Sequence, residues 1–330
     1  MNLTATNRGL GCVTLADLHS AQSRLRGITT HTQLIEFHHA DASRRLFLKP
    51  ENQQPIGAFK LRGAYNKIAS LSEEERKRGV ISYSSGNHAQ GVAYAARALG
   101  VKAVIVMPNN APAIKREATA ALGADIVLVG PGSTERQLKA EELAARHGYI
   151  IVPPYNDEKI IAGQGTMALE ILEDMPDVET VLAPVGGGGL ISGVAAALKL
   201  TKPSVNVFGV EPELAADAQA SLRTGKIVQF PAEQVTRTLA DGLRTQSVGP
   251  INFNHMRCFV DGIVTVTEDQ IRDAMKMLAR NPRTVAEPSG AVATAGFLFR
   301  ANQLPPTRLN VAIISGGNIE PQMLADLRRP

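Results

Sequence analysis

Short runs of apolar, β-branched residues alternate with Ala- and Leu-rich helical segments along the chain. This alternation constrains the fold more than any other feature of the sequence. Each run has the length of a buried strand, and each helical segment is long enough to cross from one strand to the next. Strands joined by such crossovers lie parallel in one sheet, with right-handed connections. The pattern therefore predicts an α/β fold with open, mostly parallel sheets and flanking helices.

The predicted strands form two series. The strands of the first series are expected at residues 80–84, 101–107, 125–129 and 149–152. The helices between and after them each end at a glycine, which is a common helix terminator: Gly100, Gly123 and Gly148. The strands of the second series are expected at residues 180–185, 205–210, 263–266 and 310–314.

The opening part of the chain is expected to complete the second sheet. It contains a predicted helix at residues 14–26 and a short apolar segment at 46–49. The first series would then interrupt the second. We therefore expect two domains: a small one, residues 79–156, is inserted in a large one formed by residues 1–78 and 157–330.

Composition excludes several classes of function. Of the 330 residues 44% are hydrophobic, which is ample for the cores of two domains. No apolar run approaches the ~18 residues of a membrane span, and the first dozen residues do not have the pattern of a secretion signal. We therefore expect a cytoplasmic protein without membrane contact. Acidic and basic residues interleave despite a net charge of +4, and only 4% of residues are aromatic, so we expect no nucleic-acid partner.

The chain has two cysteines, Cys12 and Cys258. They are far apart in the sequence, and neither has the CxxC or Cys/His spacing that holds zinc. We therefore expect neither a disulfide nor a zinc site.

Two loops in the first half of the chain have residues suited to chemistry. Lys60 lies among apolar residues in GAFKLRGA (57–64), where desolvation would lower the pKa of its amine and let it form a Schiff base. A solvated lysine is the alternative. In SSGNH (84–88), between a strand and a helix, the hydroxyls and exposed N–H groups suit a carboxylate or phosphate. An ordinary helix cap is the alternative, although a cap needs neither Asn87 nor His88.

Two glycine-rich loops follow later strands. Four consecutive glycines precede a helix, where their N–H groups and the helix dipole can hold a phosphate: Gly186, Gly187, Gly188 and Gly189. A flexible linker is the alternative, and the absence of GxGxxG and Walker patterns argues against dinucleotides and ATP. In ISGGN (314–318), Ser315 could hydrogen-bond a heterocyclic nitrogen. A reactive lysine, a phosphate loop, a carboxylate site and a ring-nitrogen partner are together the parts that pyridoxal phosphate needs.

The motifs resemble those of the fold type II, or β-family, pyridoxal-phosphate enzymes, in the serine/threonine dehydratase and serine racemase branch. The resemblance extends over residues 14–325 and rests on motifs in the family's order: GAFKLRGA, SSGNH, IAGQGT (161–166), VGGGG, ADG (240–242), EPSGA (287–291) and SGGN. It implies a tryptophan-synthase-β-like fold, a homodimer and a small hydroxy amino acid as substrate.

The resemblance also implies roles for residues around the cofactor. Lys60 would hold pyridoxal phosphate covalently and, once released, take the α proton of the substrate. Phe59 would lie beside the ring, Asn87 would hydrogen-bond the phenolic oxygen, and Ser315 would hydrogen-bond the pyridine nitrogen. The four glycines would bind the phosphate.

The substrate carboxylate would be held by two hydroxyls and by the backbone that follows them: Ser84, Ser85, Gly86, Asn87 and His88. Ser85 would also face the ring opposite Lys60, as the second acid/base group that racemisation needs.

Two further positions are implied by the same resemblance. Glu211, the Ala215 carbonyl and Asp217 are spaced as in the divalent-metal site of serine racemases, and oxygen ligands suit Mg²⁺ or Ca²⁺. A polar surface turn is the alternative. Arg136 falls where serine racemases and 3-hydroxyaspartate lyases have an arginine, and it could hold a second carboxylate. A solvated arginine is the alternative there.

The chain departs from the family pattern in three places. Ala58 replaces a serine found in many members, and Tyr83 replaces a histidine of animal serine racemases, so regulation by ATP cannot be carried over. The chain ends soon after SGGN, so we expect no regulatory domain and no feedback by isoleucine.

We expect the protein to convert L-threonine or L-serine to a 2-oxo acid and ammonia. Serine racemase and threo-3-hydroxyaspartate ammonia-lyase are the alternatives within the family. A non-catalytic amino-acid sensor is the alternative of another class.

Overall fold

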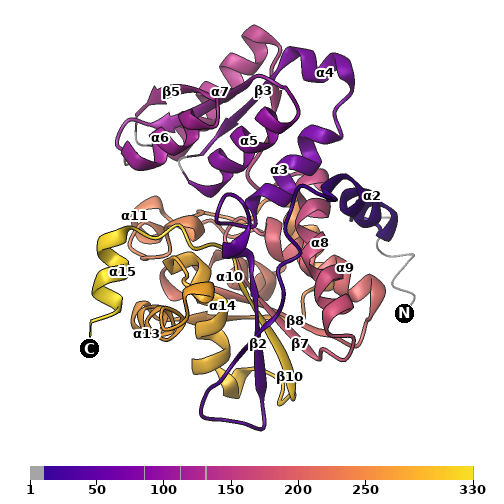
Figure 1. The fold of residues 1–330 in the computed structure, drawn as a ribbon, viewed down its shortest axis with the longest axis vertical. Coiled ribbons are helices and arrows are strands. Elements are labelled where there is room, and N and C mark those ends of the chain that lie inside the picture. The colour runs from indigo at the N-terminus through magenta and orange to yellow at the C-terminus, as the bar shows by residue number, and fades with distance from the viewer. Residues whose placement is uncertain (1–10, 85, 112, 131, 330) are drawn as a thin grey trace.

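The computed structural model describes residues 11–84, 86–111, 113–130 and 132–329. Its strands form two sheets, one of six strands and one of four. Helices cover the sheets, and the unit with the smaller sheet lies above the unit with the larger one (Figure 1). The predicted α/β class with two open, mostly parallel sheets is therefore confirmed.

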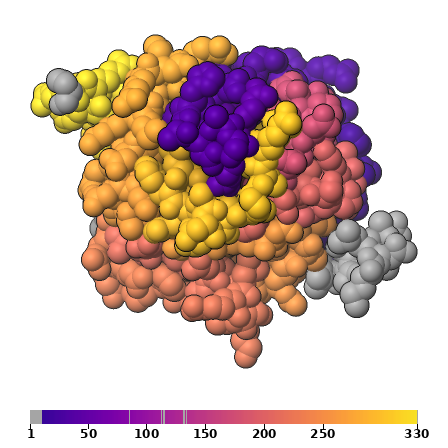
Figure 2. Space-filling model, turned by 90° about the horizontal axis from the view of Figure 1, so that it is seen from below, coloured from indigo at the N-terminus to yellow at the C-terminus, as the bar shows by residue number. Residues whose placement is uncertain are grey.

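The larger sheet comes from both ends of the described chain. Its strands, in order across the sheet, are β1 (Ile35–Phe37), β2 (Arg45–Pro50), β10 (Leu309–Ile314), β7 (Thr180–Pro184), β8 (Asn206–Pro212) and β9 (Gly262–Val266). Neighbours pair parallel except β1 and β2, which are antiparallel. Seen from below, indigo N-terminal residues lie against yellow C-terminal ones (Figure 2), in keeping with the pairing of β2 with β10.

The smaller sheet is parallel throughout. Its strands, in order, are β5 (Asp125–Val129), β4 (Ala103–Pro108), β3 (Val80–Tyr83) and β6 (Ile150–Ile151). Every residue of β4 is buried, as expected of a central parallel strand that is covered on both faces. All four strands lie in the sequence between β2 and β7 of the larger sheet. That residues 79–156 form a separate domain stays a prediction.

Most helices follow a strand and lead to the next one. The α-helices are α2 (Leu15–Leu25), α3 (Lys60–Ala69), α4 (Glu73–Arg78), α5 (Asn87–Ala98), α6 (Ala113–Ala121), α7 (Ser133–His147), α8 (Glu158–Asp174), α9 (Gly189–Thr201), α10 (Asp217–Thr224), α11 (Ala232–Val235), α12 (Pro250–Phe259), α13 (Glu268–Leu278), α14 (Pro288–Phe299) and α15 (Pro321–Leu327). The 3₁₀-helices are η1 (Glu51–Gln53), η2 (Glu213–Ala215), η3 (Asp241–Leu243), η4 (Pro282–Thr284) and η5 (Ala301–Gln303). None of the described helices is both long and apolar enough to cross a membrane.

The contact between α3 and α8 lies between the two sheets (Figure 1). The backbones of the two helices approach closely, because a Cβ at Gly163 would lie 2.6 Å from the Arg62 carbonyl oxygen and 2.7 Å from the Gly63 Cα. The Gly63 N–H also donates to the Gln164 side chain at 3.1 Å. This contact fixes α3, and Lys60 is its first residue.

Candidate active site

The four predicted loops meet at one cavity of about 440 Å³. They follow β3, β7 and β10 or begin α3, so the cavity lies at the carboxyl ends of strands from both sheets. Many of the predicted site residues line it: Phe59, Lys60, Ser84, Gly86, Asn87, His88, Arg136, Gly186, Gly187, Gly188, Gly189 and Ser315. Ser85 lies outside the described residues.

The amine of Lys60 lies in a desolvated position. Its Nζ donates to the Pro154 carbonyl oxygen at 2.7 Å and is 5.1 Å from the centre of the Phe59 ring. Burial lowers the pKa of Lys60 to about 8. This shift from the usual 10.5 raises the fraction of free amine at pH 7 by roughly 300-fold, which favours a nucleophilic lysine over a solvated one.

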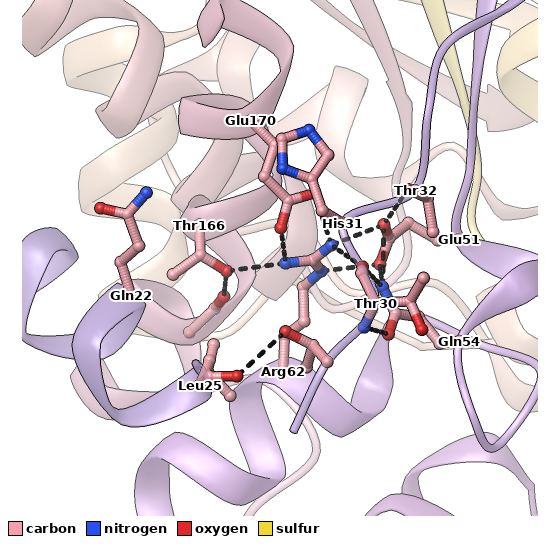
Figure 3. Close-up of polar contacts among 12 residues, drawn as sticks. Gln22, Leu25, Thr30, His31, Thr32, Glu51, Gln54, Arg62, Thr166 and Glu170 are labelled. Carbon is pink, nitrogen blue, oxygen red and sulfur yellow. Dashed lines mark hydrogen bonds and ion pairs between the residues drawn. The ribbon is translucent and has the colours of Figure 1, made fainter. Parts of the chain in front are cut away.

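A buried ionic network holds α3 on the side away from Lys60. A helix turns by about 100° per residue, so Arg62 and Lys60 point in opposite directions. Figure 3 shows the Arg62 guanidinium between two carboxylates: it is 2.7 Å from Glu51 and 2.7 Å from Glu170, with two hydrogen bonds to each. Lys49 lies 2.6 Å from Glu170 and completes the network. These residues give no joint signal in the sequence, because they come from separate elements.

Asn87 is oriented by partners on both sides of its amide. Its Nδ2 donates to Glu287 Oε1 at 2.6 Å, and its Oδ1 accepts from Asn318 Nδ2 at 2.7 Å. Asn318 also donates to the Ile56 carbonyl oxygen at 2.9 Å. Burial and the nearby Asp241 charge raise the pKa of Glu287 to about 8. Glu287 is a cavity residue to which the sequence analysis gave no role, although it opens the EPSGA motif.

Only the backbone of His88 is predicted to hold the substrate carboxylate, and its side chain has a different partner. Its Nε2 lies 3.0 Å from the Val152 carbonyl oxygen, and its Nδ1 is buried without a hydrogen-bond partner among the described residues. Burial and the Lys60 charge lower the pKa of His88 to about 3. The ring is therefore neutral at pH 7, with Nε2 as the donor.

The glycine loop requires glycine on steric and conformational grounds. Gly188 has a φ of 93°, in the left-handed region, and caps α9. A Cβ at Gly187 would collide with the Tyr155 ring, and one at Gly188 would lie 2.9 Å from the Asn252 Cβ. First-turn amides of a helix have no acceptor within the helix, so this loop presents donors suited to a phosphate.

The lysine loop and the last glycine loop are joined by backbone hydrogen bonds. The Phe59 N–H donates to the Ser315 carbonyl oxygen at 3.0 Å, and the Gly317 N–H donates to the Gly57 carbonyl oxygen at 2.9 Å. The Ser315 hydroxyl is 3.4 Å from the Ser289 carbonyl oxygen at the cavity wall. Lys60 and Ser315 are thus held in a fixed relation although 255 positions separate them.

Charged groups from the two units meet at the cavity mouth. Lys115 on α6 lies 2.9 Å from Asp241 on η3, and both line the cavity. Arg136, at the start of α7, also lines it, and burial lowers the pKa of its guanidinium. Of these three, only Arg136 has a role predicted from the sequence, although Asp241 lies in the ADG motif. Lys115 and Asp241 lie in different units, so only the fold reveals their pairing.

The predicted metal ligands lie close to the wall of this cavity. Glu211, Ala215 and Asp217 are buried. Burial and the nearby Asp217 charge raise the pKa of the cavity residue Tyr155. Glu211 accepts from the N–H groups at the start of α10. The described residues contain no group of three His, Cys, Asp or Glu side chains arranged for a metal. The predicted set has two carboxylates and one backbone carbonyl.

The charges of this carboxyl pair are not balanced by a cation in the described part of the chain. Neither Asp217 carboxylate oxygen has a well-formed hydrogen bond there. Burial raises the pKa of Asp217 to about 7. The backbone amides of Asp217 and Val248 act in the opposite direction and offset part of the effect of burial. Burial and the Asp217 charge raise the pKa of Glu211 well above its usual value. Buried oxygens of this kind fit a divalent cation better than a polar surface turn.

Comparison with known proteins extends these observations. The family model described as "Pyridoxal-phosphate dependent enzyme" matches residues 25–316. An L-threonine ammonia-lyase from Thermotoga maritima is 45% identical over 94% of this chain and 77% of its own. An L-threo-3-hydroxyaspartate ammonia-lyase from Saccharomyces cerevisiae is 39% identical over 95% of this chain and 96% of its own. The structure of maize serine racemase has a TM-score of 0.90 at 36% identity and covers 96% of both chains.

Proposed function

Since the chain belongs to the family of pyridoxal-phosphate-dependent enzymes, in the threonine dehydratase and serine racemase branch, we propose that it converts L-threonine and L-serine to 2-oxo acids and ammonia. The main support from the structure is the desolvated Lys60 amine, which lines the same cavity as the tetraglycine loop.

The residues of the cavity fit the cofactor. Lys60 would hold it through the amine, and the amides of Gly186, Gly187, Gly188 and Gly189 would hold its phosphate. Asn87 would donate to the phenolic oxygen and Ser315 to the pyridine nitrogen. When bound, pyridoxal phosphate supplies an electron sink for bond breaking at the α-carbon of an amino acid.

The chain's own groups would supply binding and proton transfer. A free Lys60 amine, with its lowered pKa, can take a proton from the α-carbon and return one to the leaving hydroxyl. The Ser84 hydroxyl and the amides of Gly86, Asn87 and His88 lie at the start of α5, where the helix dipole favours a substrate carboxylate. Ser85 keeps its predicted role as the second acid/base group.

Arg136 supports threo-3-hydroxyaspartate as a competing substrate. It lines the cavity, and a guanidinium can hold a second carboxylate with two hydrogen bonds. The yeast relative is named for an activity on this compound. Threonine ranks first because the relative at 45% identity is an L-threonine ammonia-lyase.

One panel of substrates separates the three activities. Purified holoenzyme is given L-threonine, L-serine and L-threo-3-hydroxyaspartate, and 2-oxobutyrate, pyruvate, oxaloacetate and D-serine are measured. The proposal predicts the highest kcat/KM for threonine or serine. A many-fold preference for hydroxyaspartate that Arg136→Ala abolishes would contradict it, and so would D-serine as the main product.

We also propose that Glu211, the Ala215 carbonyl and Asp217 hold Mg²⁺ or Ca²⁺. The cation would compensate two buried carboxylates near Val248, and the neighbouring Gly249 N–H donates to the Gly187 carbonyl oxygen at 3.1 Å. A bound cation would thereby support the glycine loop. The homodimer and the cytoplasmic location stay predictions.

A further inference from the structure

Cys12 and Cys258 are in contact although 246 positions separate them. The Cys12 thiol donates to the Cys258 Sγ at 3.8 Å, and both are free thiols of intermediate exposure. Their separation along the chain predicts no disulfide. The fold brings the two thiols into contact, so their separation along the chain is no argument against a disulfide.

A second contact fixes the backbone next to Cys12. The Val13 N–H donates to His255 Nε2 at 2.9 Å, and His255 Nδ1 is 2.7 Å from the Ile251 carbonyl oxygen. Nε2 accepts, so Nδ1 carries the proton of a neutral ring. His255 and Cys258 are three residues apart on α12 and therefore on one face of it. The segment before α2 is thus docked on α12 at two adjacent points.

We infer that Cys12 and Cys258 form a modification site, at which a low-molecular-weight disulfide oxidises the pair to a reversible intramolecular disulfide. A disulfide has an S–S distance of about 2.05 Å, so the sulfurs must approach by roughly 1.8 Å. Rotation about the two Cα–Cβ bonds can supply a movement of this size.

The oxidation consists of two exchange steps. The Cys258 thiolate attacks one sulfur of oxidised glutathione, which gives a mixed disulfide and one glutathione thiolate. The Cys12 thiol then loses its proton and displaces the second glutathione thiolate from Cys258. Two protein thiols are oxidised, one glutathione disulfide is reduced, and the two protons end on the two glutathione molecules.

The environment of Cys12 assigns it to the second step. Burial raises the pKa of Cys12 to about 12, and the neighbouring Cys258 and Glu158 act in the same direction. Cys12 is therefore protonated at pH 7 and a poor first nucleophile. Once Cys258 carries glutathione, Cys12 is already at contact distance, and the second step is intramolecular.

The disulfide would tie the N-terminal segment to the helix behind the glycine loop. A Cβ at Gly188 would lie 2.9 Å from the Asn252 Cβ and 3.2 Å from the Met256 Sδ, and both residues belong to α12. A link across this long loop restricts the unfolded chain. The oxidised protein should therefore melt at a temperature about 5 °C higher than the reduced protein.

The test uses the full chain with its cofactor, incubated with oxidised glutathione at pH 8. Intact mass, peptide mapping without reduction, and Tm before and after dithiothreitol are measured. The expected product has lost two hydrogens, links the peptides of Cys12 and Cys258, and returns to the original mass and Tm on reduction. Cys12→Ser should instead retain one glutathione on Cys258.

Three results would overturn the inference: stable glutathione adducts on the wild-type chain, a link between two chains, or unchanged thiols that react readily once the protein is unfolded. The wild-type measurement is decisive even if the Cys12→Ser variant does not fold. Turnover is not measured, so the result is independent of the proposed activity.

Discussion

Glu287 is a buried carboxyl in direct contact with Asn87, the residue proposed to hold the phenolic oxygen of the cofactor. Its pKa of about 8 keeps it protonated at pH 7. Above pH 8 it would place a negative charge one hydrogen bond away from an anionic group of the cofactor. We therefore predict that Glu287 is a positioning residue, which acts through Asn87.

Glu287→Gln tests this role. The amide oxygen can still accept from Asn87, but it cannot ionise. The dissociation constant of pyridoxal phosphate is measured with the apoprotein at pH 7 and pH 9. We expect the ratio of the wild-type constant to the variant constant to rise by up to roughly tenfold between these pH values. Lys60 also titrates between these pH values, but it does so in both proteins, so its effect on cofactor binding cancels in the ratio. A ratio that does not change with pH would refute the role.

Some site residues could be predicted from local sequence and others could not. Lys60 among apolar neighbours, four glycines between a strand and a helix, and Ser315 after the last strand are local signals. The resemblance supplied the role of Asn87. Glu287, Lys115 and Asp241 act through partners that only the fold brings near. The same holds for Cys12 and Cys258, where separation along the chain gave a false reason to exclude a disulfide.

At the scale of elements, α3 depends on its buried ionic network. Removing Arg62 would leave Glu51 and Glu170 buried without their main partner. Breaking such a pair costs about 3–5 kcal/mol. We therefore expect Arg62→Ala to lower the free energy of unfolding by about 3–5 kcal/mol in urea titrations, with loss of cofactor because α3 carries Lys60.

A surface arginine gives the matched control. Arg45 pairs with Glu36 at 2.9 Å, but their side chains are 43% and 36% exposed. Arg45→Ala should therefore lower the free energy of unfolding far less than Arg62→Ala does. Similar losses for the two variants would show that the buried network contributes no more than an exposed pair.

The start of α10 should respond to pH and to chelation. The pKa of Asp217 is about 7 in the fold against an ordinary 3.8. Between these values the folded state holds a proton that the unfolded chain has lost, so without metal stability falls as pH rises toward 7. Asp217→Asn removes this loss. With chelator present, the free energy of unfolding of the variant relative to wild type should rise by up to about 3 kcal/mol from pH 4 to pH 7.

Added Mg²⁺ or Ca²⁺ provides the second half of this test. Either ion should raise the Tm of the wild-type protein and leave that of Asp217→Asn unchanged. The proposed site would be contradicted if the difference in free energy of unfolding between variant and wild type did not change with pH. Equal stabilisation of both proteins by metal would also contradict it.

Long periodic elements were easier to predict than short ones. The strands expected at 125–129 and 310–314 match β5 and β10 closely. The strand β1 was not predicted. It has only three residues, none of them buried, and so few residues show no hydrophobic periodicity. It forms the edge of the larger sheet, where it pairs antiparallel with β2.

At the scale of the molecule, the two units are linked across the cavity mouth by the Lys115–Asp241 ion pair. The pair is partly exposed, 26% and 43%, and so is worth less than about 1 kcal/mol. This pair alone would not prevent opening to admit substrate, provided that residues 79–156 move as one unit and that the contacts of Asn87 with Glu287 and Asn318 also release. We predict that this movement is what a separate domain of residues 79–156 contributes to function.

Hydrogen exchange measures that movement. With cofactor and a non-reacting amino-acid analogue bound, we expect slower amide exchange in α6 and η3, which contribute the pair, and no change in the centre of β4. Equal protection throughout residues 79–156 and the larger sheet, or none in α6, would count against a moving domain.

The attachment of the cofactor to Lys60 is the claim on which the proposed function depends, and it can be measured directly. The protein is purified with pyridoxal phosphate, reduced with borohydride to make the attachment permanent, digested and analysed by mass spectrometry. The account predicts a pyridoxyl group on the peptide that contains Lys60, and none at that position in Lys60→Ala. A pyridoxyl group on another lysine of the wild-type protein, or full activity in Lys60→Ala, would contradict the account.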